Sequence, residues 1–145
     1  MAKSLFSAAI HQRNCQKEKN KAIGLSNWSH KNISMDKVTR YQEAILKVLN
    51  EYAKIKPSNI KNIENQVIAD KANNHYQLMR VGWDKNEFIH DCVMHFDIKE
   101  EKVWIQCNWT DIDVAEELMS YGVARLDIVL GFIPENERAL TGYAA

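Results

Sequence analysis

The chain has 145 residues, enough to bury the hydrophobic core of one domain. Its content of 46% hydrophobic and 26% charged residues excludes a fibrous or a wholly disordered protein. The formal net charge is zero, yet residues 1–34 carry six basic groups and one acid, which leaves 13 basic and 18 acidic groups in residues 35–145. A main part with a net charge of −5 argues against autonomous binding to DNA, because DNA phosphates must be neutralised by cations.

Three cysteines, Cys15, Cys92 and Cys107, form no CxxC pair and are typical of free thiols in a reducing compartment. The apolar run over residues 5–10 is too short for a secretory signal. No segment approaches the roughly 18 apolar residues of a membrane span. We therefore expect a cytoplasmic protein without a membrane anchor.

Residues 1–34 mix Lys, Asn, Ser and Gln with scattered apolar residues and show no sustained period. We expect a poorly ordered basic extension there, followed by a single domain over residues 35–145. Met35 opens a clean helical pattern, so two alternatives have about equal weight. Either the start codon is assigned too far upstream, or the extension is a genuine basic arm.

The next segment, residues 36–54, is predicted as one long amphipathic helix. Ser34 is the expected N-cap, Asp36 suits the first turn, and Lys56-Pro57 ends the helix. The apolar residues with the spacing of one helical face are Val38, Tyr41, Ile45, Val48, Leu49 and Tyr52.

Four strands are predicted after this helix, over residues 63–70, 75–83, 88–98 and 103–107, separated by short polar turns. Short connections make consecutive strands antiparallel neighbours. Simple alternation in the third strand places one set of side chains on a single face: Phe88, His90, Cys92, Met94, Phe96 and Ile98.

A second, short helix is expected after Thr110, which forms a capping-box pattern with Asp113, and Gly122 is well placed to end it. Residues 127–132 form either a docking turn or a fifth strand. The predicted fold class is α+β: a long N-terminal helix on an antiparallel sheet of about four strands, then a short helix and an irregular C-terminal segment.

Two groups of polar residues are candidate sites. Cys92 and His95 are expected on opposite faces of their strand, so they cannot share a metal ion. Cys92 and Cys107 are therefore interpreted as core cysteines. His95 and Asp97 are expected to share a face with Asp91. They form either an acid–base pair or part of a solvated polar face, and the solvated face is the favoured interpretation. Without a nucleophile motif or a phosphate-binding loop, we expect no enzyme, no metal and no cofactor.

Four tryptophans, Trp28, Trp83, Trp104 and Trp109, are many for this length. Stacking on nucleic-acid bases would need basic neighbours, whereas acids lie close by. Core or protein-interface tryptophans are therefore the better interpretation. The residues we nominate for contact with a partner protein are Trp104, Trp109, Asp111, Asp113, Glu116 and Glu117.

Over about residues 35–145 the sequence resembles the fdxN element excision controlling factor family (XisI-like proteins) of cyanobacteria. The order and spacing of several segments carry this resemblance. These segments are Asn74-His75-Tyr76-Gln77-Leu78, Val81-Gly82-Trp83-Asp84, His95-Phe96-Asp97-Ile98, Val103-Trp104-Ile105-Gln106, Ala115-Glu116-Glu117-Leu118, Asp127-Ile128-Val129-Leu130-Gly131-Phe132 and Thr141-Gly142-Tyr143-Ala144.

The resemblance implies a regulatory factor of programmed DNA excision by site-specific recombination, with no catalytic residues. Its expected partner is the recombinase or a companion excision factor, so that contact with DNA is indirect. Three alternatives remain open: direct nucleic-acid binding by the basic arm 1–34, a minor enzyme using His95 and Asp97, and self-association through tryptophans or an open sheet edge.

Overall fold

A computed structural model describes residues 25–56, 58 and 61–145, which belong to two units divided between Asp36 and Lys37. The expectation for residues 1–24 lies outside the described residues. Helix α2 (Leu25–Ala53) begins upstream of Ser34, so the prediction that Ser34 caps it is wrong. The segment before Ser34 contains no proline and no glycine after Gly24, and its polar residues each lower helix stability only slightly.

The second unit contains the rest of α2, whose apolar face is buried as predicted. The residues of this face that are at most 3% exposed are Tyr41, Ala44, Ile45, Val48 and Leu49. They pack into the hydrophobic core that the sheet and the following short helix also line. The part of α2 after Lys37 is thus the cover that the sheet requires.

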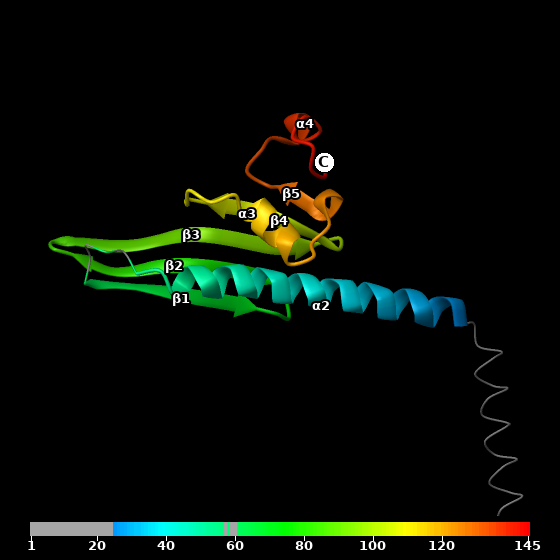
Figure 1. Cartoon of the computed structure of the whole chain (residues 1–145), viewed down its shortest axis with the longest axis horizontal. Coiled ribbons are helices and arrows are strands. Elements are labelled where there is room, and N and C mark those ends of the chain that lie inside the picture. Colours follow the sequence, from blue (N-terminus) through cyan, green and yellow to red (C-terminus); the bar gives the residue numbers. More distant parts are fainter. Residues whose placement is uncertain (1–24, 57, 59–60) are drawn as a thin grey trace, which may run out of the picture. The chain divides into compact units, whose positions relative to one another are not determined.

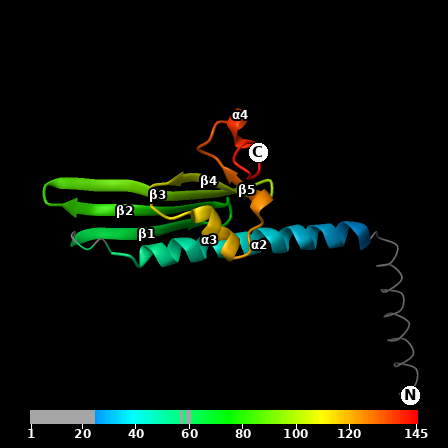
Figure 2. The same cartoon turned by 45° about the horizontal axis from the view of Figure 1, so that its top comes forward.

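Five strands form the sheet, in the order β1-β2-β3-β4-β5, as Figures 1 and 2 show. Their bounds are Asn62–Asp70, His75–Asp84, Glu87–Lys99, Lys102–Asn108 and Ile128–Leu130. The first four strands are antiparallel neighbours, as predicted, and β5 pairs in parallel with β4. Within residues 127–132, predicted as either a docking turn or a fifth strand, Ile128–Leu130 therefore form a strand.

Tight turns join the antiparallel strands. Between β3 and β4, Lys99 pairs with Lys102, and both intervening residues, Glu100 and Glu101, have positive φ of 51° and 59°. Two such residues make a hairpin turn whose twist matches that of the strands. A positive φ costs each of these non-glycine residues a small amount of conformational free energy, which strand pairing and core burial offset.

Two β-bulges change which side chains share a face, and one prediction is wrong as a result. Leu78 pairs with Met94 but Met79 pairs with Cys92, so Val93 is an extra residue in β3. A bulge of this kind reverses the alternation beyond it.

The predicted set on one face of β3 therefore divides into two. Met94, Phe96 and Ile98 face α2 and are buried. Cys92, and before it His90 and Phe88, lie on the opposite side of the sheet, here called the far face. The second bulge lies in β4, where His95 pairs with Cys107 and Phe96 with Ile105, so that Gln106 is the extra residue.

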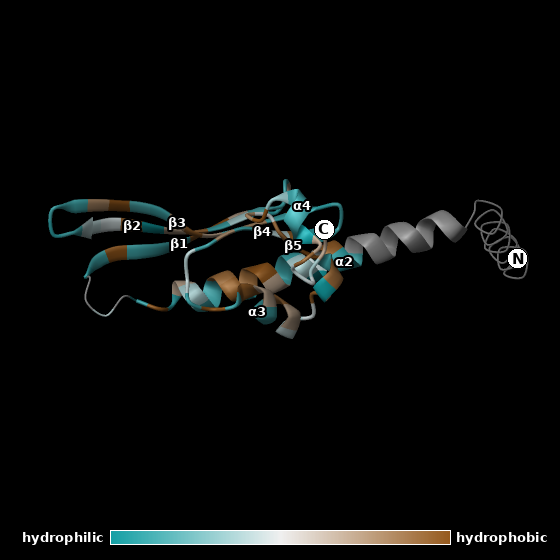
Figure 3. Cartoon of the chain, turned by 90° about the horizontal axis from the view of Figure 1, so that it is seen from above, coloured by the Kyte–Doolittle hydropathy of each residue, from teal (hydrophilic) through white to brown (hydrophobic). Residues whose placement is uncertain are grey.

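The same side of the sheet as α2 is also covered by α3 (Val114–Ser120), and the apolar residues gather where these helices meet the strands (Figure 3). Asp113 caps α3 by accepting hydrogen bonds from the backbone of Ala115 and Glu116. The predicted capping box with Thr110 at its start is therefore wrong by three residues. Thr110 instead bonds to Asn108, while Gly122, at φ 93°, ends the helix as expected.

The C-terminal segment is more regular than expected. It contains η1 (Arg125–Asp127), strand β5 and α4 (Glu135–Arg138), and Ala144 forms a parallel bridge to Val129. Among the described residues, no helix is both long and apolar enough to cross a membrane.

The carboxylate of Asp127 links η1 to α2, and we expect it to make the stability of the fold depend on pH. Tyr41 Oη donates to Asp127 Oδ2 at 2.6 Å, and Lys37 Nζ lies 2.9 Å from the same oxygen. Burial raises the pKa of Asp127, but the hydrogen bond from Tyr41 and the nearby Lys37 outweigh it, so the pKa lies below its ordinary value.

A depressed carboxyl pKa in the folded state stabilises the fold above the unfolded pKa of about 4, and this contribution disappears as the pH falls through the folded pKa. We expect Asp127→Asn to lower the free energy of unfolding by about 1 kcal/mol at pH 7, and we expect this difference to shrink as the pH falls below about 4. Urea denaturation of both proteins at several pH values measures this difference. A gap that stays constant down to pH 2 would show that the Asp127 charge contributes nothing.

Candidate functional site

A buried carboxylate on the far face is the centre of the first candidate site. Asp97 is only 4% exposed. His75 Nδ1 lies 2.7 Å from Asp97 Oδ1, and His95 Nε2 lies 3.1 Å from the same oxygen. Gln106 Nε2 donates to Oδ2 at 2.9 Å, and Lys99 Nζ lies 3.1 Å from Oδ2.

Three strands bring these side chains together. His75 pairs directly with Asp97 across β2 and β3, His95 lies two residues away on the same face of β3, and Gln106 reaches over from the bulge in β4. The predicted pairing of His95 with Asp97 is confirmed. The favoured picture of a solvated face is wrong for Asp97, because its neighbours exclude water from it.

The sequence did not indicate His75, Lys99 or Gln106 as part of this cluster. His75 is paired with Asp97 by strand register, which no spacing along the chain reveals, and Gln106 faces the cluster only because of a bulge. Asp91, expected beside Asp97, instead pairs with Arg80 beyond the bulge at Val93.

The charge state of Asp97 follows from these contacts. Burial raises the pKa of this carboxyl, but hydrogen bonds from His75, Gln106 and Lys99, with the His95 ring nearby, hold its pKa well below the ordinary range. Asp97 is therefore a carboxylate at neutral pH. An ionised carboxylate that contacts two imidazoles can bind a proton or a cation.

Trp104, which the sequence nominated for contact with a partner, pairs with Asp97 across β3 and β4 and so lies beside this cluster. Two cations lie over its ring: Lys99 Nζ is 5.5 Å from the centroid, and the Arg138 guanidinium is 5.0 Å from it. Such cation–π contacts on the ring disfavour stacking against a partner. Within the described residues its indole Nε1 is buried without a hydrogen-bond partner.

Trp109 is more accessible than Trp83 and Trp104 and forms a second candidate site. Its side chain is 83% exposed, and it stands where β4 ends, with its backbone N–H donating to Val93 O. It lines a groove of about 520 Å³ together with residues of β2, β3 and β4: Arg80, His90, Asp91, Cys92, Val93 and Cys107. A large apolar ring held in water beside a groove is a common feature of binding surfaces.

The acidic residues nominated with Trp109 differ in whether another part of the protein already uses their carboxylates. Asp111, Glu116 and Glu117 are exposed, whereas Asp113 uses its carboxylate to cap α3. Trp109, Asp111, Glu116 and Glu117 are thus the nominated residues that remain available to a partner.

The thiols of Cys92 and Cys107 lie close together on the far face rather than in the core. The first is held by a contact of 3.3 Å to Met94 O. The bulge at Val93 places Cys92 on the same face as His95, so the predicted opposition of these two residues is wrong. Burial raises the pKa of both thiols, which makes them weak nucleophiles and weak metal ligands at neutral pH.

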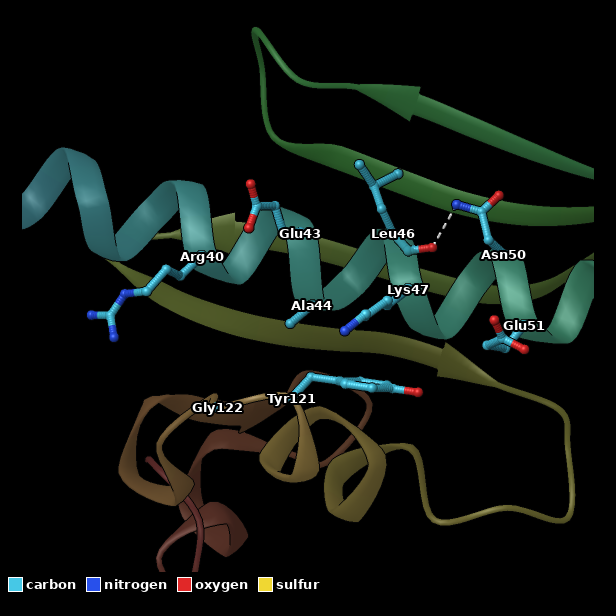
Figure 4. Close-up of a pocket in the computed structure, with 9 residues that line it drawn as sticks. All are labelled: Arg40, Glu43, Ala44, Leu46, Lys47, Asn50, Glu51, Tyr121 and Gly122. Carbon is cyan, nitrogen blue, oxygen red and sulfur yellow. Dashed lines mark hydrogen bonds between the residues drawn. The ribbon is translucent and has the colours of Figure 1, made fainter.

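A further groove, of about 500 Å³, lies between α2 and the turn that follows α3 (Figure 4). Lys47 Nζ lies 4.8 Å from the centroid of the Tyr121 ring there. The acids Glu43 and Glu51 balance the basic side chains of this groove, so its charge favours no particular ligand.

Comparison with known proteins agrees with the resemblance noted in the sequence. A family model described as XisI protein matches residues 35–145. The crystal structure of a XisI-like protein from Anabaena variabilis ATCC 29413 is 45% identical, covers 74% of this chain and 98% of its own, and superposes with a TM-score of 0.70.

A second crystal structure, of the fdxN element excision controlling factor XisI from the same organism, is 26% identical. It covers 74% of this chain and 97% of its own, with a TM-score of 0.64. No curated protein matches the chain.

Proposed function

The chain belongs to the XisI protein family, and on that premise we propose that it is a non-catalytic factor that controls excision of a DNA element by binding a partner protein. The partner is a site-specific recombinase or a companion excision factor in the cytoplasm. Support for a role in excision comes from the solved neighbour described as an excision controlling factor.

The observation that carries the partner-binding part of this proposal is the exposure of Trp109. Burying a tryptophan stabilises a fold, so an indole that is 83% exposed contributes little to folding. Tryptophan is the residue type most enriched among those that dominate protein–protein binding energy. Asp111, two residues after Trp109, is also exposed and carries a negative charge, whereas the nominated acids Glu116 and Glu117 are exposed on α3, on the side of the sheet that α2 covers.

The strand edge beside Trp109 suggests how the partner binds. β4 pairs with β3 only from Met94 to Lys99, and Val93 O accepts a hydrogen bond from the Trp109 backbone. Among the described strands none pairs with the remainder of that edge, Glu87 to Cys92. An extended peptide can add to such an edge through backbone hydrogen bonds. The partner segment would then run past Trp109, which anchors it.

Charge favours a basic partner. The region from Met35 onward carries 13 basic and 18 acidic groups, and a DNA-binding recombinase must present cations to phosphates. Complementary charge speeds association and helps exclude wrong partners.

Affinity measurement with the purified partners tests this proposal. We expect Trp109→Ala to weaken binding to the recombinase or the companion factor by at least about 30-fold, the loss typical of a dominant interface residue. Isothermal titration calorimetry or surface plasmon resonance gives the dissociation constants. The free energy of unfolding should stay within about 0.5 kcal/mol of wild type, because the side chain is exposed.

Trp83→Ala is the matched control, since Trp83 is 52% exposed and packs against Phe88 at the far end of the β2–β3 hairpin. This variant should bind as wild type does. Equal losses for both variants, or no binding of wild type to either partner, would refute the proposal.

Direct DNA binding by residues 1–34 is the alternative, supported by their charge of +5. It requires an affinity for DNA that falls steeply with salt and disappears when this segment is deleted. Trp109→Ala would then leave DNA affinity unchanged, which separates the two mechanisms.

A further inference from the structure

The polar cluster on the far face is arranged as a set of metal ligands rather than only as a hydrogen-bond network. His75 Nδ1, His95 Nε2 and an oxygen of Asp97 all lie within 4.8 Å of one another. Bonds of 2.0–2.2 Å in a tetrahedral zinc site place neighbouring ligand atoms about 3.3–3.6 Å apart. The observed N···O distances of 2.7 and 3.1 Å are hydrogen-bond lengths shorter than this spacing, so a small outward rotation of the two imidazoles would admit an ion.

We propose that His75, His95 and Asp97 bind one divalent transition-metal ion, for which Zn²⁺ is well suited. Two imidazoles and one carboxylate favour zinc and its neighbours over Mg²⁺ and Ca²⁺, which prefer oxygen ligands alone. Three protein ligands leave a fourth position open to water or to a group from a partner.

The ligands project from paired strands of the sheet. His75 and Asp97 face each other across paired strands, directly beside the buried pair Tyr76 and Phe96. His95 lies two residues before Asp97 on the same strand, so all three side chains project from one surface of the sheet. Fixed backbone positions lower the entropic cost of assembling a metal site.

The second oxygen of the carboxylate is fixed by other groups. Gln106 Nε2 donates to Asp97 Oδ2, and Lys99 pairs with the same atom. These contacts orient the carboxylate so that Oδ1 points at the two imidazoles. Ligating carboxylates are commonly positioned in this way, and loss of such a supporting group weakens metal binding.

Access and charge are both compatible with binding. The side chains of His75 and His95 are 54% and 28% exposed, so an ion can reach them from water. The Lys99 ammonium opposes a second cation, but its side chain is 49% exposed and has the Trp104 ring as another partner. It can therefore move away from the carboxylate when an ion arrives.

Zinc titration of the full chain, reduced and stripped with a chelator, tests the site. We expect one Zn²⁺ per chain by competition with a chromophoric chelator. His75→Ala and His95→Ala should each weaken binding by more than about 100-fold, whereas Gln106→Ala, which only releases the carboxylate, should cost about 10- to 100-fold. Co²⁺ should give the visible spectrum of a nitrogen–oxygen site without a thiolate band.

Two control proteins make the outcome specific to this cluster. His90→Ala removes an exposed histidine of the same strand that contacts Phe88 instead, and the double change Cys92→Ser with Cys107→Ser removes the neighbouring thiols. Both should bind zinc as wild type does.

Three results would overturn the assignment. They are a wild-type chain that binds no zinc at micromolar concentration, unchanged affinity in His75→Ala and His95→Ala, and loss of binding in the cysteine variant. Circular dichroism of each variant confirms that it is folded. This test does not involve Trp109, so its result is independent of partner binding.

Discussion

Replacing Phe96 by alanine should destabilise the protein by about 3–5 kcal/mol, because it removes a large side chain from the centre of the core. Phe96 is 0% exposed and pairs with Tyr76 on one side and Ile105 on the other. Neighbours held by strand pairing cannot collapse into the space, so a cavity remains.

The melting temperature of Phe96→Ala should fall by roughly 10–20 °C, which thermal denaturation measures directly. Phe88→Ala is the matched control on the same strand, since Phe88 is 53% exposed and makes an aromatic contact with Trp83 at 5.1 Å. Its loss should cost less than about 1 kcal/mol. Similar melting temperatures for the two variants would contradict the assignment of Phe96 to the core.

Replacing Gly82 by alanine should cost about 3 kcal/mol or more, through a clash between strands. Gly82 has a φ of 150° and pairs with Ile63 of β1. A Cβ added to it would lie 2.0 Å from the backbone oxygen of Asn62 and 2.8 Å from the Ile63 Cα. Neither atom belongs to a flexible side chain, so β1 must move away and lose its pairing there.

Hydrogen exchange locates this effect, with the amides at the start of β1 losing protection in Gly82→Ala. Gly122→Ala is the control, because Gly122 also has a positive φ, of 93°, but its added Cβ meets no atom within 4 Å. Only backbone strain of about 1–2 kcal/mol is expected there. Equal costs for the two variants would show that the close approach of β1 is unimportant.

The two candidate sites involve different parts of the sheet. Near the cluster around Asp97, Arg138 of the C-terminal segment contacts the Trp104 ring. Trp109 marks the place where β4 stops and the edge of β3 continues alone. A partner that adds a strand at this edge would approach along the same face as the proposed metal ligands.

The helices and most strands could be predicted because their signals are local. The apolar stripe from Tyr41 to Leu49 repeats every three or four residues, and burial of that stripe is what the structure shows. Gly122 ends α3 for the reason read in the sequence, since its φ of 93° suits a residue without a side chain. The family was also recognisable, because its short segments keep their order and spacing over residues 35–145.

The sites could be predicted only in part. His95 and Asp97 were paired correctly, because two residues apart on one strand share a face. The partners His75 and Gln106 were missed, and Cys92 was assigned to the wrong face. Trp109 was nominated, but the sequence could not separate it from Trp104, whose ring two cations contact.

The sequence by itself therefore determined which segments become helix or strand, which helical face is buried, and the family. Tertiary structure alone decided which polar residues meet, because that depends on strand register and on the bulges at Val93 and Gln106. Periodicity arises from interactions between residues close together along the chain. A bulge arises from competition between whole strands for pairing and core burial, and moving the register by one residue exchanges the two faces of a strand.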